Sequence, residues 1–117
     1  MIDNAQEYAL SAEAMKWYWK QFINDAEDLE NPYCRPMAAK DFSNLPSTYL
    51  ITADLDPLRD QGLELSKQLE IAGNTVIYKN YPSLIHGSLL MQGFLPEAQR
   101  AVKEIAEVVK QFLNKSE

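Results

Sequence analysis

The stretch that decides the fold is TYLITADLDPLRDQGLELSKQLEIAGNTVIYKNY, residues 48–81. Its opening segment, residues 48–53, is nearly all apolar and rich in β-formers, which is typical of a strand buried on both faces of a parallel sheet. Leucines at helical spacing predict a helix over residues 59–72 that stops at Gly73. Residues 75–81 predict a second strand. Strand, helix and strand together indicate a parallel β-α-β unit with a right-handed crossover.

Helices are predicted on both sides of this unit. Apolar and aromatic residues in the first 30 positions follow the helical period, Ser11 is a candidate N-cap, and the polar residues 25–30 are expected to end the helix. A last amphipathic helix is expected from Pro96 to Leu113. The predicted order is therefore helix, strand, helix, strand, helix, and the predicted fold class is α/β.

Composition limits the partners and the compartment. The chain has 117 residues and a net charge of −6, which argues against nucleic acid or an anionic membrane surface as a partner. The single cysteine, Cys34, forms no internal disulfide, so a reducing, cytoplasmic location is expected. No apolar run approaches the roughly 18 residues that span a bilayer, and the first residues show no signal-peptide pattern.

Two residues with catalytic potential follow the two predicted strands. Asp56 lies three residues past the first predicted strand, and His86, the only histidine, lies five residues past the second. Neighbouring parallel strands are ~4.8 Å apart and end at one edge of the sheet, so a carboxylate and this imidazole are expected to meet there. A carboxylate that holds Nδ1–H makes an imidazole a useful general base. A structural role for His86 stays open, and Asp54 and Asp60 compete with Asp56 for the partner role.

Five short motifs occur in order over residues 45–87: Leu45-Pro46, Asp56-Pro57-Leu58-Arg59-Asp60-Gln61-Gly62, Ala72-Gly73, Tyr81-Pro82 and Ile85-His86-Gly87. With these motifs, residues 45–87 resemble the C-terminal part of the hormone-sensitive-lipase-like α/β-hydrolases, a family of carboxylesterases, acetyl esterases and lipases. The segment around Met15–Trp19 and Asn31-Pro32-Tyr33 also resembles what precedes this part of the family pattern, so the similarity covers essentially the whole chain.

The resemblance implies a role for each matching residue. Asp56 would be the acid and His86 the base of a Ser-His-Asp triad. Arg59, Asp60 and Gly62 match positions that are structural in the family. The whole chain, residues 1–117, would be a single partial hydrolase domain in which residues 1–47 lead into a β-α-β-α unit at 48–117.

The sequence departs from the family pattern in two ways. Ser88 stands where the family usually has an aromatic residue after the histidine, which implies a lost wall of the acyl pocket. No G-x-S-x-G or HGGG-type motif occurs in the 117 residues, so the nucleophilic serine and the oxyanion donors are missing. The chain is therefore expected to be inactive alone, as a truncated product, an excised domain or a fragment that needs a partner.

Three functional alternatives follow from the missing serine. The chain is a segment of an esterase, a non-catalytic oligomerisation or interaction module, or a half-enzyme complemented in trans by an N-terminal hydrolase half. An exposed apolar edge on the first strand favours a homo-oligomer. We expect no cofactor and no metal, because one histidine without clustered carboxylates or thiols is a poor metal site and no phosphate-binding glycine loop is present.

Overall fold

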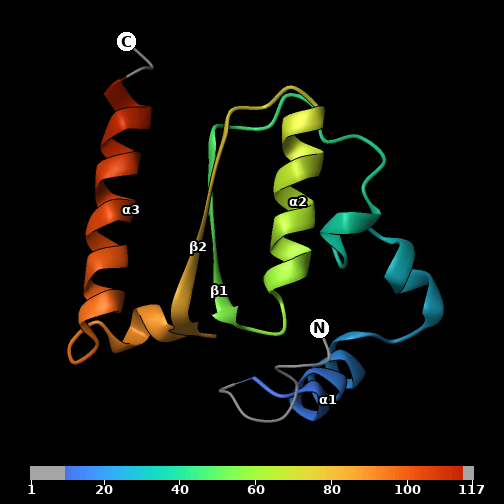
Figure 1. The fold of residues 1–117 in the computed structure, drawn as a ribbon. Coiled ribbons are helices and arrows are strands. Elements are labelled where there is room, and N and C mark those ends of the chain that lie inside the picture. Colours follow the sequence, from blue (N-terminus) through green and yellow to red (C-terminus); the bar gives the residue numbers. More distant parts are fainter. Residues whose placement is uncertain (1–9, 115–117) are drawn as a thin grey trace.

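The computed structural model describes residues 10–114 of the chain (Figure 1). Its centre is a two-stranded parallel sheet, which confirms the predicted β-α-β unit and the partial α/β fold. The strands are β1 (Thr48–Leu55) and β2 (Val76–Ile85), joined by helix α2 (Arg59–Ile71). The other elements are helices α1 (Ala12–Phe22) and α3 (Pro96–Asn114) and the short 3₁₀ helices η1 (Ala26–Glu30), η2 (Pro36–Ala38) and η3 (Ser88–Met91).

The helices lie on different sides of this sheet. Figure 1 shows α2 along one side of the strands and α3 on the other, with α1 beside the carboxyl ends of both strands. Helix α2 contacts both strands, whereas α3 contacts mainly η3 and β2. Each parallel strand therefore ends at the same edge of the sheet, next to α1.

Both strands run further than the sequence predicts. β1 ends at Leu55, and β2 continues through Pro82 to Ile85. The ladder is irregular there, because pairing passes from Ala53↔Tyr81 directly to Leu55↔Ile85. An irregularity of this kind accommodates a proline, which has no N–H for the ladder. The predicted spacing of the site residues was therefore wrong: Asp56 and His86 each follow their strand directly.

The first predicted helix ends shortly before the polar residues 25–30, where the sequence also places its end. It begins where Ser11 caps it, since the Ser11 hydroxyl accepts a hydrogen bond from the Ala14 N–H, and it ends at Phe22. Residues 26–30 instead form η1, whose N-cap Asp25 accepts from the backbone N–H groups of Glu27 and Asp28. A side chain that bonds nearby backbone competes with helix continuation. The part of the prediction that covers residues 1–9 lies outside the described residues.

The buried core is small and lies between the sheet and α3. It consists of Ala53, Tyr81, Leu84 and Ala101, with Ile51 and Leu89 packed against them. The Tyr81 hydroxyl and the Lys79 ammonium both donate to the Glu104 carboxylate of α3. The hydrogen bond from Lys79, followed by that from Tyr81, lowers the pKa of Glu104. Strand β2 thus packs on α3 through polar as well as apolar contacts.

Much apolar surface stays open outside this core. Helix α1 has no buried residue, and Trp17, Tyr18 and Phe22 are each more than half exposed. Several apolar residues of α3, among them Val109 and Leu113, are also exposed. None of the helices described for residues 10–114 combines the length and the apolar character needed to cross a membrane.

Gly62 gives the closest approach between α2 and the sheet. A Cβ built at this position would lie 2.6 Å from Thr52 Cγ2, inside van der Waals contact. We predict that Gly62→Ala lowers the free energy of unfolding by about 1–2 kcal/mol, because overpacking outweighs the better helix propensity of alanine. Urea unfolding followed by circular dichroism measures the change. Gly93→Ala is the matched control, since a Cβ there meets nothing within 4 Å; equal stability of both variants would contradict the prediction.

Candidate active site

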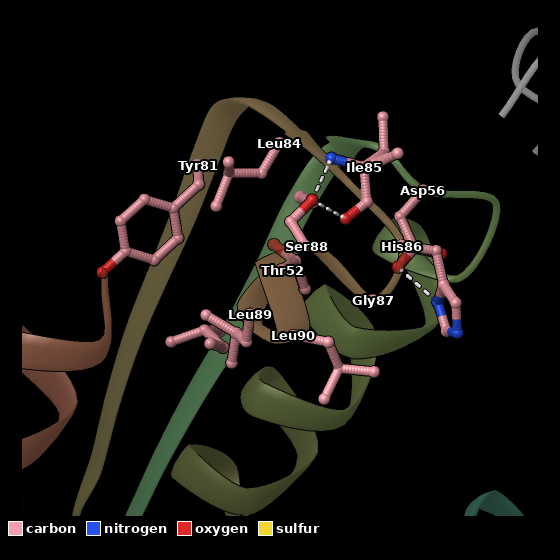
Figure 2. A pocket seen from close by; sticks show the side chains of 12 residues that line it. Thr52, Asp56, Tyr81, Leu84, Ile85, His86, Gly87, Ser88, Leu89 and Leu90 are labelled. Carbon is pink, nitrogen blue, oxygen red and sulfur yellow. Dashed lines mark hydrogen bonds and ion pairs between the residues drawn. The ribbon is translucent and has the colours of Figure 1, made fainter. Parts of the chain in front are cut away.

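His86 and Asp56 meet at the edge where the two strands end. The His86 Nδ1 atom lies 2.9 Å from Asp56 Oδ2. The Asp56 side chain is 15% exposed and the His86 side chain is 41% exposed. Figure 2 shows the imidazole at the rim of a pocket, with its second nitrogen turned away from Asp56. The carboxylate is therefore sheltered, whereas the far side of the ring is open to a reacting group.

The turn between β1 and α2 fixes the Asp56 carboxylate. Its Oδ1 atom accepts a hydrogen bond of 2.8 Å from the Leu58 N–H, and the Asp56 carbonyl accepts from the Arg59 N–H at 3.1 Å. Pro57, between them, is almost completely buried. An aspartate that bonds the backbone two residues on is a stable turn, and proline fixes its own φ. One carboxylate oxygen is thus held by the backbone while the other faces His86.

The two competing carboxylates have other partners. Asp54 Oδ1 accepts from Asn80 Nδ2 at 2.8 Å and lies 3.3 Å from Arg59 Nη1. Asp60 Oδ1 accepts from Arg59 Nε at 2.9 Å. The structure therefore brings His86 to Asp56. The other two candidates, Asp54 and Asp60, instead contact Arg59 at the start of α2.

The turn after β2 holds His86 in place. Gly87 has a φ of 75°, a left-handed conformation that glycine adopts without strain. The buried Ser88 donates its hydroxyl hydrogen to the Ile85 carbonyl at 2.6 Å and accepts from the Ile85 N–H at 2.9 Å. Sequence reasoning missed this role for Ser88. The local signal for it is a serine next to a glycine in a loop, because serine hydroxyls bond nearby backbone groups in turns.

Two hollows flank the imidazole. One, of about 240 Å³, lies between the strand ends and η3 and is the pocket drawn in Figure 2. The other, of about 630 Å³, lies between His86 and the aromatic side chains of α1, including Tyr18, Trp19 and Phe22. Leu58 and Gln61 close its remaining side. Both hollows are mostly apolar, so the ring stands between two spaces that suit non-polar groups.

The arrangement has a defined chemical capability. An ionised carboxylate only accepts hydrogen bonds, so the Asp56 contact places the ring hydrogen on Nδ1 and leaves the lone pair on Nε2. An imidazole in that tautomer can accept a proton from a nucleophile, and the adjacent carboxylate stabilises the resulting cation. Within residues 10–114, no group of three or more metal-ligating side chains comes together.

Comparisons with known proteins agree with this architecture. A family model described as the alpha/beta hydrolase fold matches residues 1–90. The chain is similar to an ester hydrolase from the metagenome of Lake Arreo, solved with a bipyridine phosphonate derivative. That structure superposes with a TM-score of 0.89 and 34% identity, over 97% of this chain and 36% of the other.

Characterised relatives give the same result. Ethyl acetate hydrolase of Pseudomonas putida is 28% identical over 106 residues, which is 91% of this chain and 33% of that protein. Esterase LipI of Mycobacterium tuberculosis is 33% identical over 104 residues, which is 86% of this chain and 32% of that protein. The chain thus spans about a third of the length of these relatives. It belongs to the hormone-sensitive-lipase-like family of α/β hydrolases.

Proposed function

We propose that Asp56 and His86 are the acid and the base of a Ser-His-Asp triad that hydrolyses carboxylic esters. The observation that carries this proposal is the 2.9 Å contact between the two side chains at the carboxyl edge of a parallel sheet. That edge is where open α/β sheets collect their ligands and catalytic groups. The similarity to ester hydrolases supports the same reaction class.

His86 would move the proton twice in such a reaction. Its Nε2 atom takes the hydrogen of the serine hydroxyl as that oxygen attacks the ester carbonyl, and then returns it to the leaving alcohol oxygen. A water molecule repeats the sequence on the acyl-enzyme and releases the acid. Asp56 stays ionised throughout and holds the imidazolium through Nδ1–H, while the Leu58 N–H fixes the carboxylate.

The serine and the oxyanion donors would come from polypeptide outside these 117 residues. Ser88 is unsuitable, because both its donor and one of its lone pairs are engaged with the backbone of Ile85. The 117 residues hold neither a G-x-S-x-G nor an HGGG-type sequence. The chain would therefore contribute two of the three triad residues to a complete site.

The exposed apolar surface supports association with further polypeptide. Within residues 10–114, no element buries the aromatic side chains of α1, of which Tyr18, Trp19 and Phe22 line one hollow, and β1 pairs only with β2. An unpaired strand edge invites pairing with another chain. In the absence of an N-terminal hydrolase half in trans, we propose that a second copy of the chain takes this edge.

The isolated chain is predicted to show no esterase activity. With p-nitrophenyl acetate, its rate should equal that of His86→Ala, because loss of the nucleophile alone costs roughly 10⁶-fold in turnover. Joined to an upstream segment that carries both missing motifs, the chain should gain activity. His86→Ala should then remove it and Asp56→Asn should lower it by roughly 10⁴-fold. Activity of the isolated chain that disappears in His86→Ala would contradict the proposal.

The tautomer of His86 provides a second test that needs no activity. Since His86 is the only histidine, the ¹⁵N shifts of its ring are unambiguous. In the neutral ring we predict hydrogen on Nδ1, and Asp56→Asn should move it towards Nε2, because an amide can offer N–H instead of an acceptor. Asp41→Asn is the matched control, as Asp41 caps Ser43 in a different loop. An unchanged tautomer in Asp56→Asn would disprove the pairing.

The association is tested by light scattering on the purified chain. We predict a dimer or larger assembly at micromolar concentration, because the exposed strand edge and aromatic helix face gain burial on self-association. A particle with the 13.4 kDa mass of one chain across a concentration series would contradict this prediction.

A further inference from the structure

A line of polar side chains crosses the sheet and leads to the turn that carries Asp56. Tyr78 and Thr52 are joined through their hydroxyls at 2.7 Å, and Thr52 Oγ1 lies 2.9 Å from Asn80 Oδ1. Asn80 Nδ2 then donates to Asp54 Oδ1 at 2.8 Å. All three contacts are partly buried and connect β2 with β1 on each step. Because Gly62 of α2 packs on Thr52, this line runs beneath α2.

The direction of the hydrogen bonds follows from the number of available hydrogens. Thr52 has one hydroxyl hydrogen, which it donates to the Asn80 carbonyl oxygen. The Tyr78 phenol must therefore be the donor in its contact with Thr52. Asn80 uses its oxygen towards Thr52 and its amide hydrogen towards Asp54. Every donor in the line points the same way, and the last acceptor is the Asp54 carboxylate.

Asp54 and Arg59 stand on either side of the turn that holds Asp56. Arg59 Nη1 lies 3.3 Å from Asp54 Oδ1 and 3.5 Å from the Asp54 carbonyl oxygen, and the Arg59 N–H donates to the Asp56 carbonyl. The Asp54 and Arg59 side chains are 39% and 38% exposed. An ion pair so accessible to water contributes little by itself. The partly buried hydrogen bond from Asn80 is the contact that orients Asp54.

We propose that Asn80 is a positioning residue for the Asp56–His86 pair, acting through Asp54 and Arg59. The importance of Asn80 for catalysis rests on the proposed function, but its effect on the geometry of the Asp56–His86 pair does not. Asn80 fixes the Asp54 carboxylate two residues before Asp56. Asp54 and Asp60 together hold the Arg59 side chain at the start of α2, and the Arg59 N–H donates to the Asp56 carbonyl, so the turn keeps Asp56 Oδ2 facing His86. Loss of the Asn80 amide hydrogen should therefore loosen the His86 contact without removing any group from it.

Asn80→Asp tests this inference with minimal change of shape. The new oxygen would face Asp54 Oδ1 where a donor stood at 2.8 Å, so the two would repel each other. We expect the ring hydrogen of His86 to shift most of the way to the Asp56→Asn distribution, as read from ¹⁵N shifts of the neutral imidazole. Circular dichroism verifies that the variant stays folded.

Asn74→Asp is the matched control. The Asn74 amide donates to the Phe42 and Leu69 carbonyls, so the same substitution also removes partly buried donors there. Asn74 precedes β2 and His86 follows it, and a strand of 10 residues at ~3.3 Å per residue places them about 30 Å apart. Asn74→Asp should lower the melting temperature but leave the His86 tautomer unchanged. A tautomer shift as large as that of Asn80→Asp would overturn the inference.

Thr52 supplies an uncharged second test. Thr52→Val removes the hydroxyl that orients the Asn80 amide, whereas Thr52→Ser keeps it. We expect a smaller tautomer shift in Thr52→Val than in Asn80→Asp, and the wild-type distribution in Thr52→Ser. If Asp56→Asn changes the tautomer but Asn80→Asp and Thr52→Val do not, the positioning role is wrong while the pair stands. If Asp56→Asn itself has no effect, the proposed triad pair fails.

Discussion

Parallel pairing between β1 and β2 is the constraint on which the rest of the structure depends. It brings two loops that are 30 residues apart in sequence to one edge, so that Asp56 and His86 lie within hydrogen-bond distance. An antiparallel pair would place the two strand ends at opposite edges. The parallel arrangement requires a crossover, and α2 provides it with the close contact at Gly62.

The site residues are held mainly by backbone and buried polar contacts. Leu58 fixes the Asp56 carboxylate, and Ser88 fixes the turn beside His86. The apolar core lies beside these contacts, since its members Ala53, Tyr81 and Leu84 also line the smaller hollow next to His86. A polar scaffold specifies direction as well as position, since each donor must meet an acceptor. These polar contacts and the small core together define the positions of Asp56 and His86.

The sequence predicted the β-α-β unit and the pair of residues because both depend on local patterns. Apolar strands, leucine spacing and the stop at Gly73 are short-range signals, and Gly73 indeed has a φ of 85°. The predicted strand ends were too early: β1 runs two residues past its predicted end, and β2 continues through Pro82, which the irregular ladder accommodates. Strand spacing alone left Asp54, Asp56 and Asp60 as candidates, and the family resemblance favoured Asp56. The contacts that engage Asp54 come from residues far away in sequence, such as Asn80, and no local pattern encodes these.

The register of the sheet has a consequence for how the chain folds. The rungs from Thr48↔Val76 to Ala53↔Tyr81 all join residues that are 28 apart. Closing a loop of that length costs about 3 kcal/mol in chain entropy, but the cost falls on the first rung only. Once α2 has formed and one residue pair between β1 and β2 is made, each later pair forms without closing a new loop. The remaining residue pairs of β1 and β2 should therefore form cooperatively after the first. The strand ends that carry Asp56 and His86 come together in the same cooperative step.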